Sequence, residues 1–288
     1  MYPFKLGYIE LFGAKNRDIA MARAKRHYIP GQIWHITHRC HKGEFLLKFA
    51  KDRRRWLQWL FEARRRYGLS VLNYTVTSNH IHLLVADDKS RNVIPDSIKL
   101  IAGRTGQEFN QRKARKGAYW EDRYHATAIE DGDHLIKCIV YIDLNMVRAG
   151  VVKHPGEWAY SGYNEIQQPK RKKILINYER LKELLGFDSY EHLKTAHKQW
   201  VESCLSAGDN FRNGKWTESI AVGSEAFIQN VKELMGGMAL GRKVLETGES
   251  FQLKEVQDPY IDHFGAKKGE IGAQNTYVWD QNFENATT

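Results

Sequence analysis

The sequence has few cysteines and no long apolar run. Its 288 residues include three cysteines, Cys40, Cys138 and Cys204. An odd number at such wide spacing argues against a disulfide framework and against a zinc-binding cysteine motif, so we expect a protein of the reducing cytoplasm. No apolar stretch approaches the roughly 20 residues that span a membrane. Residues 1–5 also lack the apolar core of a secretory signal, so we expect no membrane association.

Positive charge is unevenly distributed along the chain. The formal net charge is +10. Residues 21–170 hold 26 Lys and Arg against 15 Asp and Glu, whereas residues 171–288 hold 15 against 17. A basic region favours a polyanionic partner such as nucleic acid, although a solvated charged surface would give the same counts.

Alternating segments predict an α+β fold for the first half of the chain. β-rich stretches and amphipathic helical stretches follow one another, and turn residues separate several of them. We expect strands at 32–38, 69–85 (one strand or a pair) and 119–129, and helices at 52–67, 96–115 and 133–147. This order predicts a ferredoxin-like antiparallel sheet with helices packed on it.

A polar, basic stretch at residues 167–173 predicts a linker, and the pattern beyond it predicts a mainly helical C-terminal region. Helices are expected there at 178–185, 189–205 and 224–235. We therefore divide the chain into an N-terminal extension (1–22), a main domain (23–168), a helical accessory region (169–268) and a flexible tail (269–288).

The two ends of the chain resemble each other. Residues 8–15 read Tyr-Ile-Glu-Leu-Phe-Gly-Ala-Lys, and residues 260–267 read Tyr-Ile-Asp-His-Phe-Gly-Ala-Lys. Two copies so far apart are not the period of a repeat protein. Met21 is followed by Ala-Arg-Ala-Lys and resembles a natural start. We therefore expect residues 1–20 to be upstream sequence that is read through from an early start codon.

Two histidines one residue apart, His80 and His82, lie in the predicted strand region. Strand side chains alternate between faces, so both imidazoles are expected on one side, as two ligands of one metal ion require. Two packed structural histidines bonded to the backbone would have the same spacing. Imidazole accepts Mg²⁺ or Mn²⁺ less readily than oxygen ligands do, unless substrate phosphate completes the shell, and zinc also fits this ligand type.

Tyr141 and Asn145 have the i, i+4 spacing that places two side chains on one face of a helix. One interpretation is a partly buried tyrosine and a helix-end amide. The other makes the Asn145 oxygen a third metal ligand and places Tyr141 beside a bound phosphate. Ionising a phenol of pKa near 10 at pH 7 costs about 4 kcal/mol, which a metal ion and arginines would offset. Together with the histidines, these residues predict attack on a phosphodiester.

Two motifs resemble those of a known family. Residues 79–84 read Asn-His-Ile-His-Leu-Leu, and residues 141–152 read Tyr-Ile-Asp-Leu-Asn-Met-Val-Arg-Ala-Gly-Val-Val. In this order they resemble the single-tyrosine HUH transposases, in particular the branch of REP-associated tyrosine transposases. Residues 30–37 and 119–124 add to the resemblance, which covers roughly residues 23–165. Met146 stands where the family usually has proline.

The resemblance implies a ferredoxin-like core with an active site of the HUH nuclease type. His80 and His82 would hold Mg²⁺ or Mn²⁺, Asn145 would complete the metal site, and Tyr141 would be the nucleophile. The implied reaction cuts single-stranded DNA through a 5′-phosphotyrosine intermediate, leaves a free 3′-hydroxyl and ends in strand transfer. The implied substrate is an imperfect palindrome folded as a hairpin. Relatives include monomers and swapped homodimers, so both states stay open.

Basic residues around these motifs are candidates for DNA contact. They are Arg123 and Arg148 near the tyrosine motif, together with Arg104, Lys113 and Arg115. Other chemistry-bearing residues have a structural interpretation. Strand or loop packing is expected for His35, His38 and His41, and packing or base stacking for Tyr74, Tyr119 and Tyr124.

Two other functions compete with this interpretation. A two-histidine phosphoesterase needs two His-x-Thr/Ser motifs, and His35-Ile36-Thr37 is matched by no suitable second one at residues 80–82. A noncatalytic nucleic-acid-binding protein with a ferredoxin-like core is the main alternative. It would leave the histidine pair and Tyr141 without a joint purpose.

Overall fold

A computed structural model describes residues 28–208, 211–248 and 250–255. The expectations about residues 1–22, about their likeness to residues 260–267 and about the tail from 269 lie outside these ranges. No helix within the ranges is long and apolar enough to cross a membrane.

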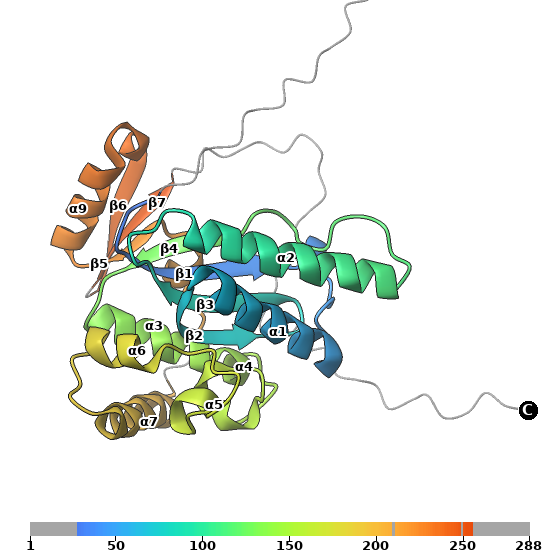
Figure 1. Ribbon diagram of the computed structural model, residues 1–288. Coiled ribbons are helices and arrows are strands. Elements are labelled where there is room, and N and C mark those ends of the chain that lie inside the picture. The colour runs from blue at the N-terminus through green and yellow to red at the C-terminus, as the bar shows by residue number, and fades with distance from the viewer. Residues whose placement is uncertain (1–27, 209–210, 249, 256–288) are drawn as a thin grey trace, which may run out of the picture. The chain divides into compact units, whose positions relative to one another are not determined.

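Four strands and two helices form the first half of the fold (Figure 1). Along the chain they are β1 (Ile33–Arg39), α1 (Ala50–Tyr67), β2 (Ser70–Val76), β3 (His80–Ala86), α2 (Val93–Arg112) and β4 (His125–Ile129). The strands lie in the order β2-β3-β1-β4, and every neighbouring pair among them is antiparallel. This is the ferredoxin-like arrangement, so the predicted fold class is confirmed.

The two faces of this four-stranded sheet differ in polarity. Thr37 on β1 and Thr75 on β2 both pair with His82 on β3. Residues paired across a ladder share a face, so these three side chains define a polar face. Ile36 and Leu83 are the next pair along and therefore belong to the opposite, apolar face.

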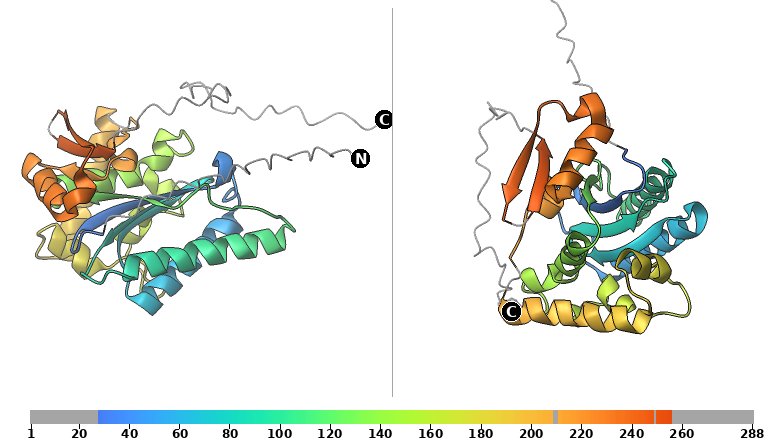
Figure 2. Two further views of the ribbon diagram at one scale, coloured as in Figure 1. Left: turned by 90° about the horizontal axis from the view of Figure 1, so that it is seen from above. Right: turned by 90° about the vertical axis from the view of Figure 1, so that its left-hand side faces the viewer.

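Different helices cover the two faces. α1 and α2 lie together on the apolar face (Figures 1 and 2). There Trp120 stacks on His38 of β1, with ring centroids 4.1 Å apart, and donates a hydrogen bond to the carbonyl of Ala102 on α2. The next helix, α3 (Asp133–Asp143), covers the polar face, because the Thr75 hydroxyl donates to the carbonyl of Ile142 at 3.1 Å.

The C-terminal part supplies helices and also extends the sheet. Its elements are α4 (Asn145–Arg148), α5 (Gly162–Gln167), α6 (Tyr178–Leu184), α7 (Tyr190–Ala207), α8 (Lys215–Glu218), β5 (Ala221–Gly223), α9 (Glu225–Met235), β6 (Arg242–Thr247) and β7 (Ser250–Glu255). The predicted helices of this region correspond to α6, α7 and α9. β5 pairs in parallel with β4, and β7 and β6 follow it in the sheet.

Three short 3₁₀ helices complete the described elements, and two predicted elements are shorter than expected. The 3₁₀ helices are η1 (His41–Gly43), η2 (Pro155–Glu157) and η3 (Gly236–Ala239). The strand predicted from residue 119 begins only at His125, and Trp120 forms an isolated bridge with Cys40 instead. The helix predicted over 133–147 is interrupted at Leu144, whose ψ of 2° departs from helical geometry and separates α3 from α4.

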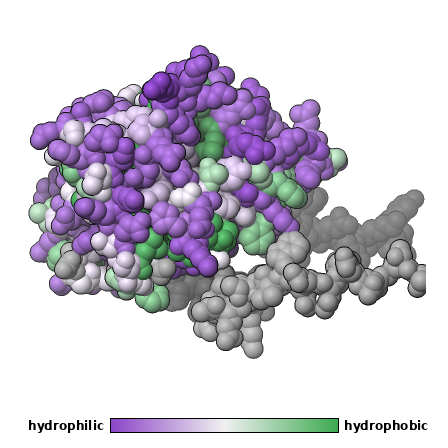
Figure 3. Space-filling model, turned by 90° about the horizontal axis from the view of Figure 1, so that it is seen from below, coloured by the Kyte–Doolittle hydropathy of each residue, from purple (hydrophilic) through white to green (hydrophobic). Residues whose placement is uncertain are grey.

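The surface reflects the high content of charged residues. The face drawn in Figure 3 is mostly hydrophilic and is interrupted by small hydrophobic patches. Large apolar side chains such as Trp56, Leu60 and Ile101 are instead fully or almost fully buried between the helices and the sheet.

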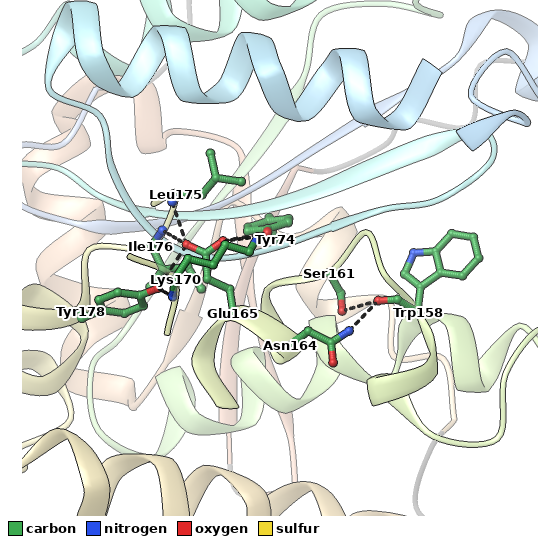
Figure 4. A network of polar contacts seen from close by, with 9 residues as sticks. All are labelled: Tyr74, Trp158, Ser161, Asn164, Glu165, Lys170, Leu175, Ile176 and Tyr178. Atoms are coloured by element: carbon green, nitrogen blue, oxygen red, sulfur yellow. Dashed lines mark hydrogen bonds and ion pairs between the residues drawn. The ribbon is translucent and has the colours of Figure 1, made fainter. Parts of the chain in front are cut away.

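Glu165 on α5 connects the predicted linker to the sheet (Figure 4). Its Oε1 accepts hydrogen bonds from the backbone nitrogens of Leu175 and Ile176 at 2.7 and 2.9 Å. Its Oε2 accepts one from the Tyr74 hydroxyl on β2 and pairs with Lys170 at 3.0 Å. These partners compensate a carboxylate that is fully buried. The domain boundary predicted near this segment stays a prediction.

Candidate active site

His80 and His82 lie side by side on β3. His80 is the first residue of the strand and His82 follows two residues later, so both belong to the polar face. Their ring centroids are 5.0 Å apart and their planes lie at 82° to each other. His82 is buried, with 2% of its surface exposed, so its partners determine its orientation.

A chain of hydrogen bonds fixes the tautomer of His82. The Nδ1 of His35 on β1 lies 2.8 Å from the carbonyl oxygen of Trp216, which only accepts, so His35 Nδ1 donates. In a neutral ring the other nitrogen, Nε2, then accepts, and its partner is His82 Nδ1 at 2.9 Å. His82 Nδ1 therefore carries the proton, and its Nε2 keeps a free lone pair.

His80 has the same tautomer for a different reason. Its Nδ1 lies 2.7 Å from Asn79 Oδ1 and 3.0 Å from the hydroxyl of Thr77. The Asn79 amide nitrogen donates to the carbonyl of Gly43, so its oxygen is the atom turned towards His80. His80 Nδ1 therefore donates, and Nε2 again presents a lone pair.

Burial keeps these imidazoles neutral. The pKa of His35 is lowered to about 3 and that of His80 to about 4, while the pKa of His82 is held well below its ordinary value. Loss of water around the ring is the largest cause in all three cases, and the nearby charge of Arg148 acts in the same direction. Neutral imidazole is the form that binds a metal ion.

Tyr141 and Asn145 reach the histidines from α3 and α4. The Tyr141 ring centroid lies 6.0 Å from that of His82 and 6.2 Å from that of His35. The Asn145 side-chain nitrogen lies 2.9 Å from His82 Nε2. Although Leu144 interrupts the helix, its nitrogen still donates to a carbonyl of α3 at 2.9 Å, so the two turns stay connected.

Arg148 lies over the ring of Tyr141. Its Cζ is 4.0 Å from the ring centroid, and one of its terminal nitrogens is 2.5 Å from the backbone oxygen of Tyr141. Burial raises the pKa of the Tyr141 phenol, whereas the charges of Arg148 and Arg212 act in the opposite direction. The two arginines therefore reduce the free energy needed to ionise a buried phenol.

The C-terminal part contributes Trp216 to this site, a contribution that the sequence did not predict. The Trp216 ring lies 6.2 Å from that of Tyr141, and its carbonyl accepts hydrogen bonds from His35 and from the hydroxyl of Thr127. His35 was interpreted as a strand histidine, and it does lie on β1. The available signal was a histidine in the middle of an otherwise apolar strand, which is also typical of packing.

The basic residues predicted to contact DNA do not all lie in one place. Arg148 is in the site. Lys113 lies over Phe49, with Nζ 5.5 Å from the ring centroid, and Arg115 contacts Glu44 at 3.4 Å. Arg104 lies over the Trp59 ring, on the helix layer that covers the apolar face. Arg123 lies in the bend before β4. Their contact with DNA stays a prediction.

The donor set of the site fits a divalent metal ion. Within residues 28–208, 211–248 and 250–255, no three His, Cys, Asp or Glu form a group that could hold one. The site offers two imidazole lone pairs and the amide of Asn145 instead. A half turn about χ2 exchanges the amide oxygen and nitrogen, so Asn145 can present Oδ1 at the same place. Two nitrogens and one oxygen suit an ion that completes its shell with water or phosphate.

The comparison with protein families concerns residues 31–145. This segment contains both histidines, Tyr141 and Asn145, and it matches the model of the family described as "Transposase IS200 like". This part of the chain belongs to the IS200-like transposase family. The chain is therefore an enzyme of DNA transposition. No curated protein matches it.

Two solved structures resemble the chain that carries this transposase domain. One, described as a REP-associated tyrosine transposase bound to a REP hairpin, is 20% identical with a TM-score of 0.43, and the match covers 50% of this chain and 84% of that chain. The other, provisionally described as a transposase from Deinococcus radiodurans R1, is 17% identical with a TM-score of 0.29, covering 38% and 87%. Likenesses of this size add no detail to the family assignment.

Proposed function

We propose that the chain is a metal-dependent single-stranded DNA endonuclease and strand transferase that uses Tyr141 as its nucleophile. The observation that carries this proposal is the grouping of Tyr141 with His80, His82 and Asn145 in one place. Two neutral imidazoles with free lone pairs, an amide and a phenol have no common purpose in packing. They do have one in the attack on a phosphodiester.

In the proposed reaction the Tyr141 oxygen attacks the phosphorus of the scissile phosphodiester. A new O–P bond forms while the bond to the 3′ oxygen breaks. One DNA end is then joined to the tyrosine through its 5′ phosphate, and the other ends in a free 3′-hydroxyl. The phenol proton passes to solvent, and the leaving oxygen takes up a proton. Attack of another 3′-hydroxyl on the phosphotyrosine reverses these bond changes and completes strand transfer.

The surrounding residues support each part of this reaction. The guanidinium of Arg148 over the phenol favours the negative charge that develops on the oxygen of Tyr141 and on the phosphate. His35 holds His82 in the tautomer whose Nε2 lone pair is free. Mg²⁺ or Mn²⁺ bound by His80, His82 and Asn145 would stabilise negative charge on the phosphate oxygens.

Hairpin-forming single-stranded DNA is the substrate that we propose. The resemblance of residues 79–84 and 141–152 to REP-associated tyrosine transposases supports it, and a REP hairpin is the ligand named for one of the two similar structures. The positive balance of residues 21–170 favours a polyanion of this kind.

Covalent trapping tests the proposal. The full chain is incubated with hairpin-bearing single-stranded DNA and Mn²⁺, and adducts are separated under denaturing conditions. We expect an adduct with the wild-type chain, none with Tyr141→Phe, and DNA binding by both. Tyr163→Phe is the matched control, because Tyr163 is also buried but lies on α5, and it should form the adduct normally.

Two outcomes would contradict the proposal. An undiminished adduct in Tyr141→Phe would reject Tyr141 as the nucleophile. DNA binding by the wild-type chain without any adduct would favour the noncatalytic nucleic-acid-binding alternative.

A further inference from the structure

The loop that follows β1 is held rigidly next to the candidate site. Its first residue, Cys40, donates its backbone N–H to the carbonyl of Asn79 at 2.7 Å. Further along, the backbone nitrogen of Leu47 donates to the carbonyl of Ser78 at 2.9 Å. Ser78 and Asn79 form the turn between β2 and β3, directly before His80. The loop is therefore attached to the turn that positions the first histidine.

A second set of bonds ties the same loop to α1 and to the segment before β4. Arg53 on α1 donates from one terminal nitrogen to the carbonyls of Leu47 and Lys48, at 2.9 and 2.7 Å. The Tyr119 hydroxyl donates to the carbonyl of Leu46 at 3.3 Å. Leu46 and Leu47 are buried, so apolar packing adds to these bonds. The conformation of the loop is thus determined on two sides.

This rigid loop nevertheless exposes two phenylalanines. Phe45 is 60% exposed and Phe49 is 55% exposed, while Leu46 and Leu47 between them are buried. Single exposed apolar residues are common on proteins. Two aromatic rings held in water by a loop that is otherwise well packed are less expected, because turning them inward would remove a large apolar area from water. An aromatic ring fixed in this way is suited to stacking.

Positive charge surrounds the exposed rings. Lys113 Nζ lies 5.5 Å and Lys48 Nζ 6.0 Å from the Phe49 ring centroid. Arg115 contacts Glu44 of the loop and donates to the carbonyl of Ala118 at 2.8 Å. Aromatic rings among cations are the combination that binds single-stranded nucleic acid, since the rings stack with bases and the cations meet phosphates. A purely apolar protein partner would not require these charges.

The platform is continuous with the candidate active site. The Asn79 amide donates to the carbonyl of Gly43 in the loop and turns its oxygen to His80. Arg39, at the end of β1 where the loop begins, pairs with His80 across the sheet. A strand of DNA whose phosphate lies at the histidines would therefore meet the loop within a few nucleotides.

We propose that Phe45 and Phe49 form a stacking platform for unpaired nucleobases of single-stranded DNA next to the scissile phosphate. The proposal rests on the proposed function for the position of the cut, but the binding itself needs no chemistry. It assigns Lys113 and Lys48 to the phosphates of the stacked nucleotides. It also assigns to this loop a preference for single-stranded over fully paired DNA, because bases in a duplex are already stacked.

Binding measurements on the full chain test the platform. Phe45→Ala and Phe49→Ala are compared with wild type by fluorescence anisotropy, with chelator present so that no cleavage occurs. Two probes are used, an oligothymidylate and an oligonucleotide of the same length in which the bases are replaced by abasic sites. Each substitution should weaken binding of the base-bearing probe roughly five-fold or more, and leave binding of the abasic probe unchanged. Phe→Trp at either position should restore binding.

Leu240→Ala is the matched control, because Leu240 is 83% exposed and lies before β6. It should bind both probes as wild type does. Equal weakening on both probes would indicate a structural effect and overturn the proposal, as would no weakening at all. The covalent trapping described above is independent. A normal adduct together with unchanged binding in the phenylalanine variants rejects the platform alone, whereas a missing adduct with base-dependent loss of binding rejects the nuclease and keeps the platform.

Discussion

His35 Nε2 lies 2.9 Å from His82 Nδ1, and the two rings stack with their centroids 5.1 Å apart and their planes within 17°. His35 is held in turn by the carbonyl of Trp216, which comes from a segment 181 residues further along the chain. The C-terminal part of the protein therefore sets the proton position on a residue of the candidate metal site. This dependence makes the C-terminal segment part of the site and not only an appendage to it.

Replacing His35 should weaken metal binding while the fold remains. In His35→Asn the acceptor for His82 Nδ1 is lost, so the lone pair of His82 Nε2 is no longer fixed towards the site. Loss of such an outer partner typically lowers metal affinity by 10- to 100-fold. We expect at least about a ten-fold weaker Mn²⁺ affinity by calorimetric titration, with an unchanged circular dichroism spectrum.

His38→Asn is the matched control, because His38 is also a buried histidine of β1 but belongs to the apolar face, where it stacks on Trp120. It should leave Mn²⁺ affinity unchanged. Equal affinities in the His35 and His38 variants would show that the hydrogen bond to His82 does not influence the metal site.

Arg148 should be needed for adduct formation and not for the fold of the site. Arg148→Met removes the charge above the Tyr141 ring, and we expect the rate of adduct formation to fall by about 10- to 100-fold. Arg148→Lys keeps the charge but loses the planar stacking and should fall between the two. Quenched time courses of trapping measure these rates. Arg65→Met on the exposed side of α1 should react normally; a similar loss there would indicate a general effect of surface charge.

The predicted parts of the site are those that depend on local geometry. Strand alternation alone places His80 and His82 on one face, and helical spacing alone places Asn145 near Tyr141. His35 and Trp216 could not be recognised, because their role arises from contacts between β1, β3 and the segment before β5. A strand histidine looks the same in the sequence whether it packs or orients a neighbour.

The fold shows the same division. The four-stranded core could be predicted because its strands and helices have clear periodic patterns of adequate length. β5 could not, since it has three residues and becomes a strand only by pairing with β4. β6 is mostly exposed at the edge of the sheet, so its composition carries little of the alternation that marks a half-buried strand.

Stability should contain a small acid-sensitive contribution from Glu108. Arg55 Nη2 on α1 lies 2.6 Å from Glu108 Oε1 on α2, and this bond is the main reason that the pKa of Glu108 is lowered from its ordinary value of 4.5. A carboxyl whose pKa is lower in the folded chain stabilises the fold at pH values above its unfolded pKa. That stabilisation is lost as the pH falls through the folded value.

We therefore expect Glu108→Gln to lower the free energy of unfolding by about 0.5 kcal/mol at pH 7, as is usual for partly exposed pairs. The difference from wild type should disappear at about pH 3. Urea unfolding at the two pH values measures it, and added salt should reduce the difference at pH 7. A difference that grows towards acid pH would contradict this assignment.

A glycine at the start of α5 should be essential for packing against β2. A Cβ on Gly162 would lie 2.1 Å from Asn73 Oδ1 and 3.1 Å from the backbone nitrogen of Tyr74. Asn73 has little freedom to move away, because its oxygen accepts a bond from Tyr74 at 2.7 Å and its nitrogen donates to Asp143 at 3.0 Å. We expect Gly162→Ala to destabilise the fold by about 1–3 kcal/mol in urea unfolding. Gly103→Ala, in the interior of α2 with nothing within 4 Å of the new Cβ, should instead be neutral or stabilise by up to about 1 kcal/mol. Opposite signs for two glycine substitutions in helices would separate a steric effect from helix propensity, and equal signs would remove the basis for the first.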